Sequence, residues 1–323
     1  MLIWVALPQN PAFAEPPRLR FPVVCNLGVD CWLMNVPDVA PEKGKAQDFA
    51  CGAQTYDGHS GTDIATVDRA AMEAGVDVIA AAAGTVQRLR DGEDDLFRAP
   101  ADTEKLSKSG RACGNGLIID HGDNWTTQYC HLRKGSFKVK QGDTVKASQT
   151  LAQIGLSGLT QHPSLQLTVR YKGDEIDPFT GREPKAGCGM GGTPLWGERV
   201  LLDSYNLYDA GFAPETPDFA LISQGLKPPV PDRTAKKLVF WFAYFAARKG
   251  DRIDVTLTSP QGQILAEQQI TQESAQARQY YFAGRVQRGP ALTGTYIGTA
   301  KVTRVTTNGD TRTEHITREL ILK

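Results

Sequence analysis

The 323-residue sequence lacks three features that would assign it to a specialised class of protein. No apolar run approaches the ~20 residues that a membrane-spanning helix needs, so no membrane span is predicted. Lysine plus arginine and aspartate plus glutamate each total 36 residues, and this balance leaves no bulk field that would favour nucleic acid or an anionic lipid surface. The six cysteines include no Cys-x-x-Cys pair, which argues against a zinc site built from thiolates.

The length and composition are those of an ordinary globular protein with more than one domain. A hydrophobic fraction of 41% and a charged fraction of 22% are typical of such proteins. A chain of this length fits two domains with connecting segments. The sequence is therefore expected to bury two separate cores.

The N-terminus has some features of an export signal. The first seven residues are apolar, and Ala12-Phe13-Ala14 before Glu15 matches a signal-peptidase site, although a basic n-region is absent. We predict a secretory signal over residues 1–14, truncated if the start codon was assigned too late, and hence a periplasmic or secreted location. The alternative is an apolar N-terminal tail of a cytosolic protein.

The stretch 56–63, Tyr-Asp-Gly-His-Ser-Gly-Thr-Asp, is the first candidate site. It places the imidazole of His59 and the carboxylate of Asp63 four positions apart in a segment too rich in glycine for a helix. Nitrogen and oxygen ligands suit a zinc ion, although such a pair alone is more often an ordinary surface turn. The order of the downstream segments favours a site: strands are predicted at 115–121 and 125–131, the latter ending in a histidine, and a further strand at 164–170.

This ordered series resembles the lysostaphin-like, or LytM-type, zinc metallopeptidases, which cut peptide cross-links in bacterial cell walls. Members carry a His-x-x-x-Asp motif, a later single histidine after a strand, and a final His-x-His strand. The first two correspond here to His59 with Asp63 and to His131, whereas the third reads Ser164-x-Gln166 and is degenerate. The resemblance implies zinc as cofactor, His59 and Asp63 as metal ligands, and His131 as a catalytic residue.

The residues at positions 164 and 166 determine whether zinc-dependent hydrolysis can be expected. A catalytic zinc needs three protein ligands and an open position for water. Gln166 would be the third, but its neutral amide oxygen suits calcium better than zinc, and Ser164 cannot shuttle protons as an imidazole does. His162 is the one candidate substitute ligand, with a solvated turn residue as its alternative. His121 and His315 are interpreted as surface residues.

Alternation along 164–170 predicts which way the degenerate positions point. Leu165, Leu167 and Val169 fall on one face of the strand, which we assign to the core. Ser164 and Gln166 fall on the other. We therefore expect position 166 to face the 59–63 motif across a shared cleft.

The chain is predicted to be all-β, with a LytM-type peptidase β-sheet domain followed by a small immunoglobulin-like β-sandwich. In the second domain strands are expected at 238–247, 254–258, 278–282 and 296–302. Its aromatic cluster (Phe240, Trp241, Phe242, Tyr244 and Phe245) is more typical of a core than of a carbohydrate platform. The expected organisation is a signal at 1–14, a disulfide-tethered extension at 15–50, a metallopeptidase-like domain at 51–180, a Gly/Pro-rich linker at 181–232 and the sandwich at 233–323.

The cysteines are even in number and agree with export to an oxidising compartment. If Asp120 pairs with Trp125 across a hairpin turn, Cys113 and Cys130 lie close together at its open end, which favours a bridge between them. We also predict Cys25–Cys31, and then Cys51–Cys188 would join the two ends of the enzyme-like domain. The alternative is free, buried thiols.

The sequence supports three hypotheses for function. The first is an exported pseudoenzyme of the cell envelope, whose groove binds peptidoglycan peptide or a partner cell-wall hydrolase without cutting. The second is an active zinc endopeptidase that cleaves peptidoglycan cross-links with a rearranged ligand set, in which His162 replaces a lost histidine. The third is a structural envelope protein whose two β domains are interaction surfaces, with His131 only a hydrogen-bonded histidine at a strand end.

Overall fold

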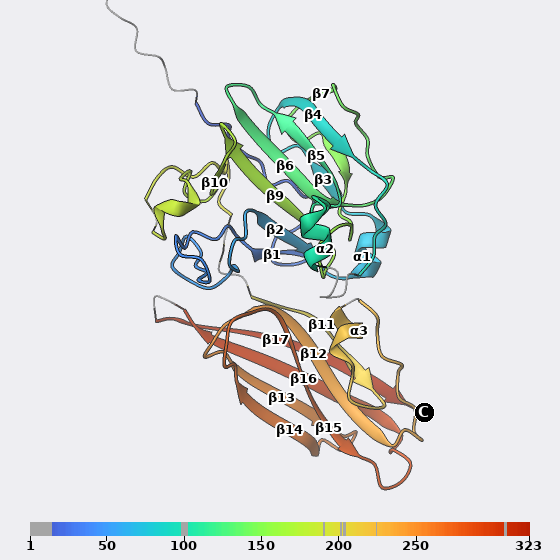
Figure 1. Cartoon of the computed structure of the whole chain (residues 1–323). Coiled ribbons are helices and arrows are strands. Elements are labelled where there is room, and N and C mark those ends of the chain that lie inside the picture. Colours follow the sequence, from blue (N-terminus) through green and yellow to red (C-terminus); the bar gives the residue numbers. More distant parts are fainter. Residues whose placement is uncertain are drawn as a thin grey trace, which may run out of the picture.

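The computed structural model describes residues 15–97, 103–189, 191–200, 202, 205–223, 225–306 and 309–323. The proposed secretory signal at 1–14 lies outside these residues. Strands dominate both halves of the chain, with only short helices between them (Figure 1), so the predicted all-β class is confirmed. Within the described residues, every helix is too short or too polar to cross a bilayer.

The first half is organised around one eight-stranded sheet in which all ladders are antiparallel. Its strand order is β1-β2-β9-β6-β5-β4-β7, and β10 pairs with β9 off this path. A two-stranded sheet of β3 and β8 packs beside it. The bounds are β1 Cys31–Asn35, β2 Thr62–Thr66, β3 Asp77–Ile79, β4 Gly84–Arg90, β5 Asn115–Asp120, β6 Trp125–Leu132, β7 Thr144–Val145, β8 Thr150–Gln153, β9 Ser164–Tyr171 and β10 Asp174–Ile176, with helices α1 Arg69–Ala74 and α2 Thr103–Lys108.

Strand β9 shows how the alternation of the sequence orients this sheet. Leu165, Leu167 and Val169 are buried in the main core, as the pattern predicts, because successive side chains of a strand point to opposite faces. Ser164 and Gln166 therefore lie on the face away from that core. The sheet presents its polar side chains on one surface, where the site is found.

The second half is a pair of packed antiparallel sheets. A three-stranded sheet has the order β11-β12-β15, and a four-stranded sheet has the order β14-β13-β16-β17. The bounds are β11 Asn206–Ala213, β12 Lys237–Ala247, β13 Arg252–Thr258, β14 Ile264–Thr271, β15 Gln276–Val286, β16 Gly294–Val305 and β17 Thr311–Leu322, with helix α3 Phe219–Ser223 and a 3₁₀ turn, η2, at Pro184–Ala186. The predicted strands and the predicted burial of the aromatic cluster are confirmed; an immunoglobulin-like connectivity stays a prediction.

The predicted extension and the predicted linker each contribute a strand to a sheet. Strand β1, within the predicted extension at 15–50, is the edge strand of the main sheet and pairs with β2. Strand β11, within the predicted linker at 181–232, pairs with β12. A register shift between Leu207 and Asp209 interrupts the alternation of β11, and the dense glycine and proline around it hide the strand from pattern reading.

The three predicted disulfides are all present, and the described cysteines leave no free thiol. The hairpin that suggested Cys113–Cys130 has a register one residue away from the one expected. Asp120 pairs with Thr126 rather than Trp125. The cause lies in the turn, where the Trp125 carbonyl accepts a hydrogen bond from the His121 amide.

The two halves are joined by an apolar contact. Trp32 and Met34 of β1 and Ala65 of β2 form one buried cluster with Phe245 of β12. The ring centroids of Trp32 and Phe245 are 5.0 Å apart. Figure 1 shows β1 and β2 at the edge of the first domain that meets the sandwich. Such burial of large aromatic surface is a strong stabilising term.

Candidate functional site

Strand register places the site residues in one row across neighbouring strands. Asp63 of β2 pairs with Asn35 of β1 on one side and with Gln166 of β9 on the other. Gln166 pairs in turn with Cys130 of β6. Directly paired residues on antiparallel strands share a face. The expectation that position 166 faces Asp63 is therefore confirmed.

His59 and Asp63 are both buried and lie in contact with each other. Asn35 donates its side-chain N–H to the Asp63 carboxylate at 2.9 Å, and the same oxygen lies 3.3 Å from Nε2 of His59. His59 is only 3% exposed, yet neither of its ring nitrogens has a hydrogen-bond partner among the residues that the structure describes. A buried imidazole without hydrogen-bond partners is costly, and coordination of a metal ion would satisfy one of its nitrogens.

The ring of Tyr56 covers His59, with 4.4 Å between the ring centroids. Partial burial and the nearby Asp63 carboxylate both raise the pKa of the Tyr56 phenol. Tyr56 therefore stays protonated at neutral pH and presents a hydroxyl at the edge of the site.

His131 reaches the same cluster through a local backbone distortion. Its φ of 66° is unusual for a residue other than glycine, and its amide donates to the Cys113 carbonyl. Nδ1 lies 2.9 Å from the Ser157 carbonyl, so this nitrogen carries a proton. Burial lowers the pKa of His131, while Asp63 and a hydrogen bond with the Gln166 side chain oppose that shift. His131 is thus a neutral imidazole directed at Gln166.

Ser164 and Gln166 occupy the positions where the resemblance calls for two histidines. The Ser164 hydroxyl donates to the His162 carbonyl at 3.1 Å and lies 3.2 Å from the Thr160 hydroxyl, so it stabilises the preceding turn. Gln166 packs so closely on Gly61 that a Cβ there would lie 2.7 Å from Cγ of Gln166. This close contact with Gly61 holds the Gln166 amide at the site.

The donor set fits only part of a zinc site. The 3.3 Å between His59 and Asp63 matches the edge of a tetrahedron with metal–ligand bonds of about 2.0 Å. In the described parts of the chain, the one trio of His, Cys, Asp or Glu with ligand atoms within 4.8 Å of one another is Cys25, Asp30 and Cys31, whose cysteines form a disulfide. The cluster around Asp63 therefore does not supply the three ligands of a catalytic zinc.

His162, the candidate substitute ligand, is directed at the domain boundary. It is 2% exposed, so the alternative of a solvated turn residue is wrong. Its Nε2 lies 2.8 Å from the Thr66 carbonyl, and its Nδ1 lies 2.8 Å from the guanidinium of Arg278. Both ring nitrogens are engaged away from Asp63.

The other two histidines lie outside the site. His315 is exposed, as predicted. His121 is half-buried rather than a surface residue. Nδ1 of His121 lies 2.7 Å from the Ala83 carbonyl and Nε2 lies 2.8 Å from the Thr127 hydroxyl, because the hairpin turn folds back over the sheet.

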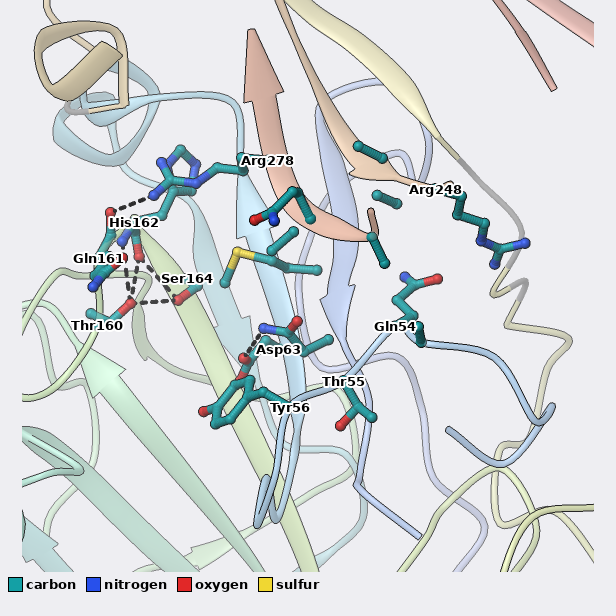
Figure 2. Close-up of a pocket in the computed structure, with 18 of the residues that line it drawn as sticks. Gln54, Thr55, Tyr56, Asp63, Thr160, Gln161, His162, Ser164, Arg248 and Arg278 are labelled. Atoms are coloured by element: carbon teal, nitrogen blue, oxygen red, sulfur yellow. Dashed lines mark hydrogen bonds between the residues drawn. The ribbon is translucent and has the colours of Figure 1, made fainter. Parts of the chain in front are cut away.

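A cavity of about 490 Å³ lies beside the cluster and is lined by both domains. Asp63, His131 and Ser164 come from the sheet, whereas Arg248 and Arg278 come from the sandwich. Figure 2 shows Thr160, Ser164 and His162 joined by hydrogen bonds and Arg278 reaching to the same turn. Sequence reasoning missed the arginines and Asn35, since nothing local in the sequence signals that they meet the motif.

Part of the chain is similar in sequence to known proteins. The model of peptidase family M23 matches residues 57–178. The chain is 33% identical over 94 residues to an uncharacterized metalloprotease of Haemophilus influenzae (28% of this chain, 19% of the relative). It is 32% identical over 111 residues to the cell division protein DipM of Caulobacter vibrioides (29% and 17%) and 35% identical over 69 residues to the murein hydrolase activator NlpD of Escherichia coli (21% and 17%). It thus spans less than a fifth of these relatives' length.

Two solved structures are similar to part of the chain. The catalytic domain of lysostaphin from Staphylococcus simulans is 20% identical, with 38% of this chain and 77% of that chain covered and a TM-score of 0.27. A zinc containing peptidase from Vibrio cholerae is 22% identical, with coverage of 44% and 39% and a TM-score of 0.29.

Proposed function

Because residues 57–178 belong to peptidase family M23, we propose that this is a cell-envelope protein whose M23 groove binds peptidoglycan peptide, or a cell-wall hydrolase, without cutting a peptide bond. The observation that carries the proposal is the place of Gln166. Its amide lies at the position where the resemblance implies a third ligand, paired with Asp63, and hydrogen-bonds to His131. His131, the catalytic residue that the resemblance implies, is thus engaged with a neighbouring side chain.

The second degenerate position supports the same conclusion. A peptidase needs a group that transfers protons beside the metal-bound water, and a serine hydroxyl does not titrate near neutral pH. The Ser164 hydroxyl is instead engaged with Thr160 and His162.

Relatives and disulfides favour the cell envelope as the location. NlpD is named a murein hydrolase activator, and DipM a cell division protein. Three disulfides in one chain are typical of an oxidising compartment. A partner hydrolase is therefore a second ligand class for the same groove.

The proposal is tested with isolated sacculi and cross-linked muropeptides, in buffer containing micromolar zinc. We expect the protein to bind sacculi and to release no new peptide ends. The variant Gln166→Ala should bind more weakly, because it removes the amide from the groove, whereas Gln268→Ala on exposed strand β14 should bind as the wild type does. Chelator-sensitive cleavage by the wild type would refute a non-catalytic role, and equal binding by both variants would favour surfaces outside the groove.

A second candidate function is metal-dependent hydrolysis with a rearranged ligand set. Neither ring nitrogen of His59 has a hydrogen bond among the described residues, and its Nε2 lies 3.3 Å from the Asp63 carboxylate, which favours this function. The hydrogen bonds of His162 to Thr66 and Arg278 weigh against it. Metal analysis after dialysis against micromolar zinc separates the two: a stoichiometric ion that His162→Ala removes would support hydrolysis.

A further inference from the structure

The β-sandwich forms one wall of the cavity beside Asp63. The end of β12, at 246–248, and the start of β15, at 275–278, line it together with the M23 residues. Its volume of about 490 Å³ lies within the range of about 300–1,000 Å³ that is usual for ligand pockets. The binding site is thus shared between two domains.

We call the face of the sheet that carries Asp63, Gln166 and Cys130 the floor of the groove. This floor ends beneath the wall. Residues two apart on a strand share a face, so the floor continues from Asp63 to Ala65 along β2 and from Gln166 to Ser164 along β9. Ala65 is buried against Phe245 of the sandwich. Beyond Ser164, His162 is bonded to Arg278. A chain lying on the floor cannot run past these residues.

Polar and apolar contacts hold the wall in place. The Arg278 guanidinium lies 2.8 Å from Nδ1 of His162 and donates to the Gln161 carbonyl at 3.0 Å. Burial lowers the pKa of Arg278, which the phenol of Tyr208 opposes. The apolar cluster that contains Phe245 adds a second contact between the sandwich and the first domain. The wall is therefore held by polar contacts of Arg278 and by apolar packing of Phe245.

In the opposite direction the floor continues. Gln128 lies two residues from Cys130 on β6 and donates to Sγ of both Cys113 and Cys130. It lines a second hollow, of about 290 Å³, together with Arg88 and Arg90 of β4. Gln128 shares the face of Cys130 on β6, so this second hollow lies on the same side of the sheet as the cavity at the sandwich.

We propose that the groove binds the carboxyl-terminal end of a peptide, with its terminal carboxylate against the sandwich wall and its preceding residues toward Gln128. This inference rests on the proposed function, since it specifies the ligand of the same groove. The charge at the wall decides which end of the peptide lies there, because cationic side chains favour a carboxylate over an ammonium group. Arg248 and Arg278 line the wall, whereas the carboxylate among the described lining residues, Asp63, lies on the floor. Complementary charge orients a ligand in this way.

Peptide extension tests the proposal directly. The probe is the stem tetrapeptide released from sacculi, compared by calorimetry with the same peptide carrying three glycines at its carboxyl end or at its amino end. Extension at the carboxyl end should lower affinity about tenfold or more, because the added residues meet the wall and the terminal carboxylate no longer lies against it. Extension at the amino end should change affinity less than about twofold.

A pair of variants tests the wall without altering the M23 residues. Gln276 is exposed and lines the cavity from the sandwich, so Gln276→Trp should fill the cavity and lower the affinity for the tetrapeptide about tenfold. The matched change Gln268→Trp, on an exposed part of β14, should leave affinity unchanged. Thermal unfolding verifies that both variants are folded.

The outcomes separate this inference from the proposed function. If the wild type binds the tetrapeptide and its carboxyl-extended form equally, the inference is overturned while groove binding stands. Equal affinities of the wild type and Gln276→Trp would overturn it in the same way. If no probe binds the wild type and Gln166→Ala binds sacculi as the wild type does, both the proposed function and the inference fall.

Discussion

Asp63 and Gln166 are paired residues on neighbouring antiparallel strands, so the position where the resemblance implies a third ligand lies beside the Asp63 carboxylate. The strands bring these two positions together as the resemblance implies, and position 166 carries an amide rather than an imidazole. Gln166 meets His131, while His59 keeps two ring nitrogens without hydrogen-bond partners among the described residues. Under the proposed function, the strands hold the site in place while position 166 lacks the imidazole of a third zinc ligand.

Replacing Gln166 by histidine should create a zinc site. The new imidazole would join His59 and Asp63 as the third ligand that zinc requires. We expect the Gln166→His variant to retain about one zinc per chain after dialysis against micromolar zinc, and the wild type to retain much less. The control is Gln128→His, on the same face but next to the Cys113–Cys130 disulfide, which should not gain zinc. A folded Gln166→His variant without zinc would mean that residue 166 does not reach the pair.

Local patterns were sufficient to predict the floor of the site. The alternation of 164–170 places Gln166 opposite the core, and the structure confirms it. The spacing of cysteines around a hairpin was sufficient for Cys113–Cys130, even though the predicted register was one residue away. In both cases the pattern that supports the prediction lies within a single strand or a single hairpin, where strand geometry is regular.

The wall of the site could not be predicted in this way. Arg278 and His162 are 116 positions apart, and their contact depends on how two domains pack. Strand β11 was missed because a bulge breaks its alternation. Pairings set by tertiary packing leave no periodic signal, so the shared cavity became visible only in the folded chain.

Removing the three disulfides one at a time should destabilise the protein by unequal amounts. Cys51–Cys188, Cys113–Cys130 and Cys25–Cys31 span 137, 17 and 6 positions. In the chain-entropy description, closing loops of these lengths contributes about 5, 3 and 2 kcal/mol respectively. Paired Cys→Ala variants followed by urea unfolding should reproduce that order. A larger effect from the Cys25–Cys31 pair than from Cys51–Cys188 would contradict it.

His121 should take up its proton at a lower pH than an exposed histidine. Burial lowers its pKa from 6.5, while the Ala83 carbonyl and the Asp120 carboxylate oppose the shift. The unfolded state therefore binds the proton first, and the free energy of unfolding should decrease as pH falls below about 6.5. Ring-proton NMR should give a midpoint below 6.5 for His121. Asp120→Asn, which removes the opposing charge, should lower the midpoint further; an unchanged or higher midpoint would contradict the assigned cause.

The buried carboxyl of Asp177 should give stability the opposite dependence on pH. Asp177 accepts hydrogen bonds from the Phe179 amide and the Thr180 hydroxyl. Burial raises its pKa from 3.8 to about 6, and Asp48 adds to the shift. The folded state therefore binds the proton more tightly than the unfolded state, and the contribution to the free energy of unfolding is largest near pH 4 and is lost as pH rises through about 6. A shift of about two pKa units corresponds to on the order of 3 kcal/mol.

The measurement is urea unfolding of the wild type and of the Asp177→Asn variant across pH 4 to 7.5. An amide keeps an oxygen that accepts the Phe179 hydrogen bond but does not titrate, so the variant should lack this dependence on pH. The titration of His121 and of other groups is common to both proteins and cancels in the difference. The free energy of unfolding of the wild type minus that of the variant should therefore fall as pH rises. A difference that stays constant with pH would show that Asp177 is ionised in the folded protein throughout this range.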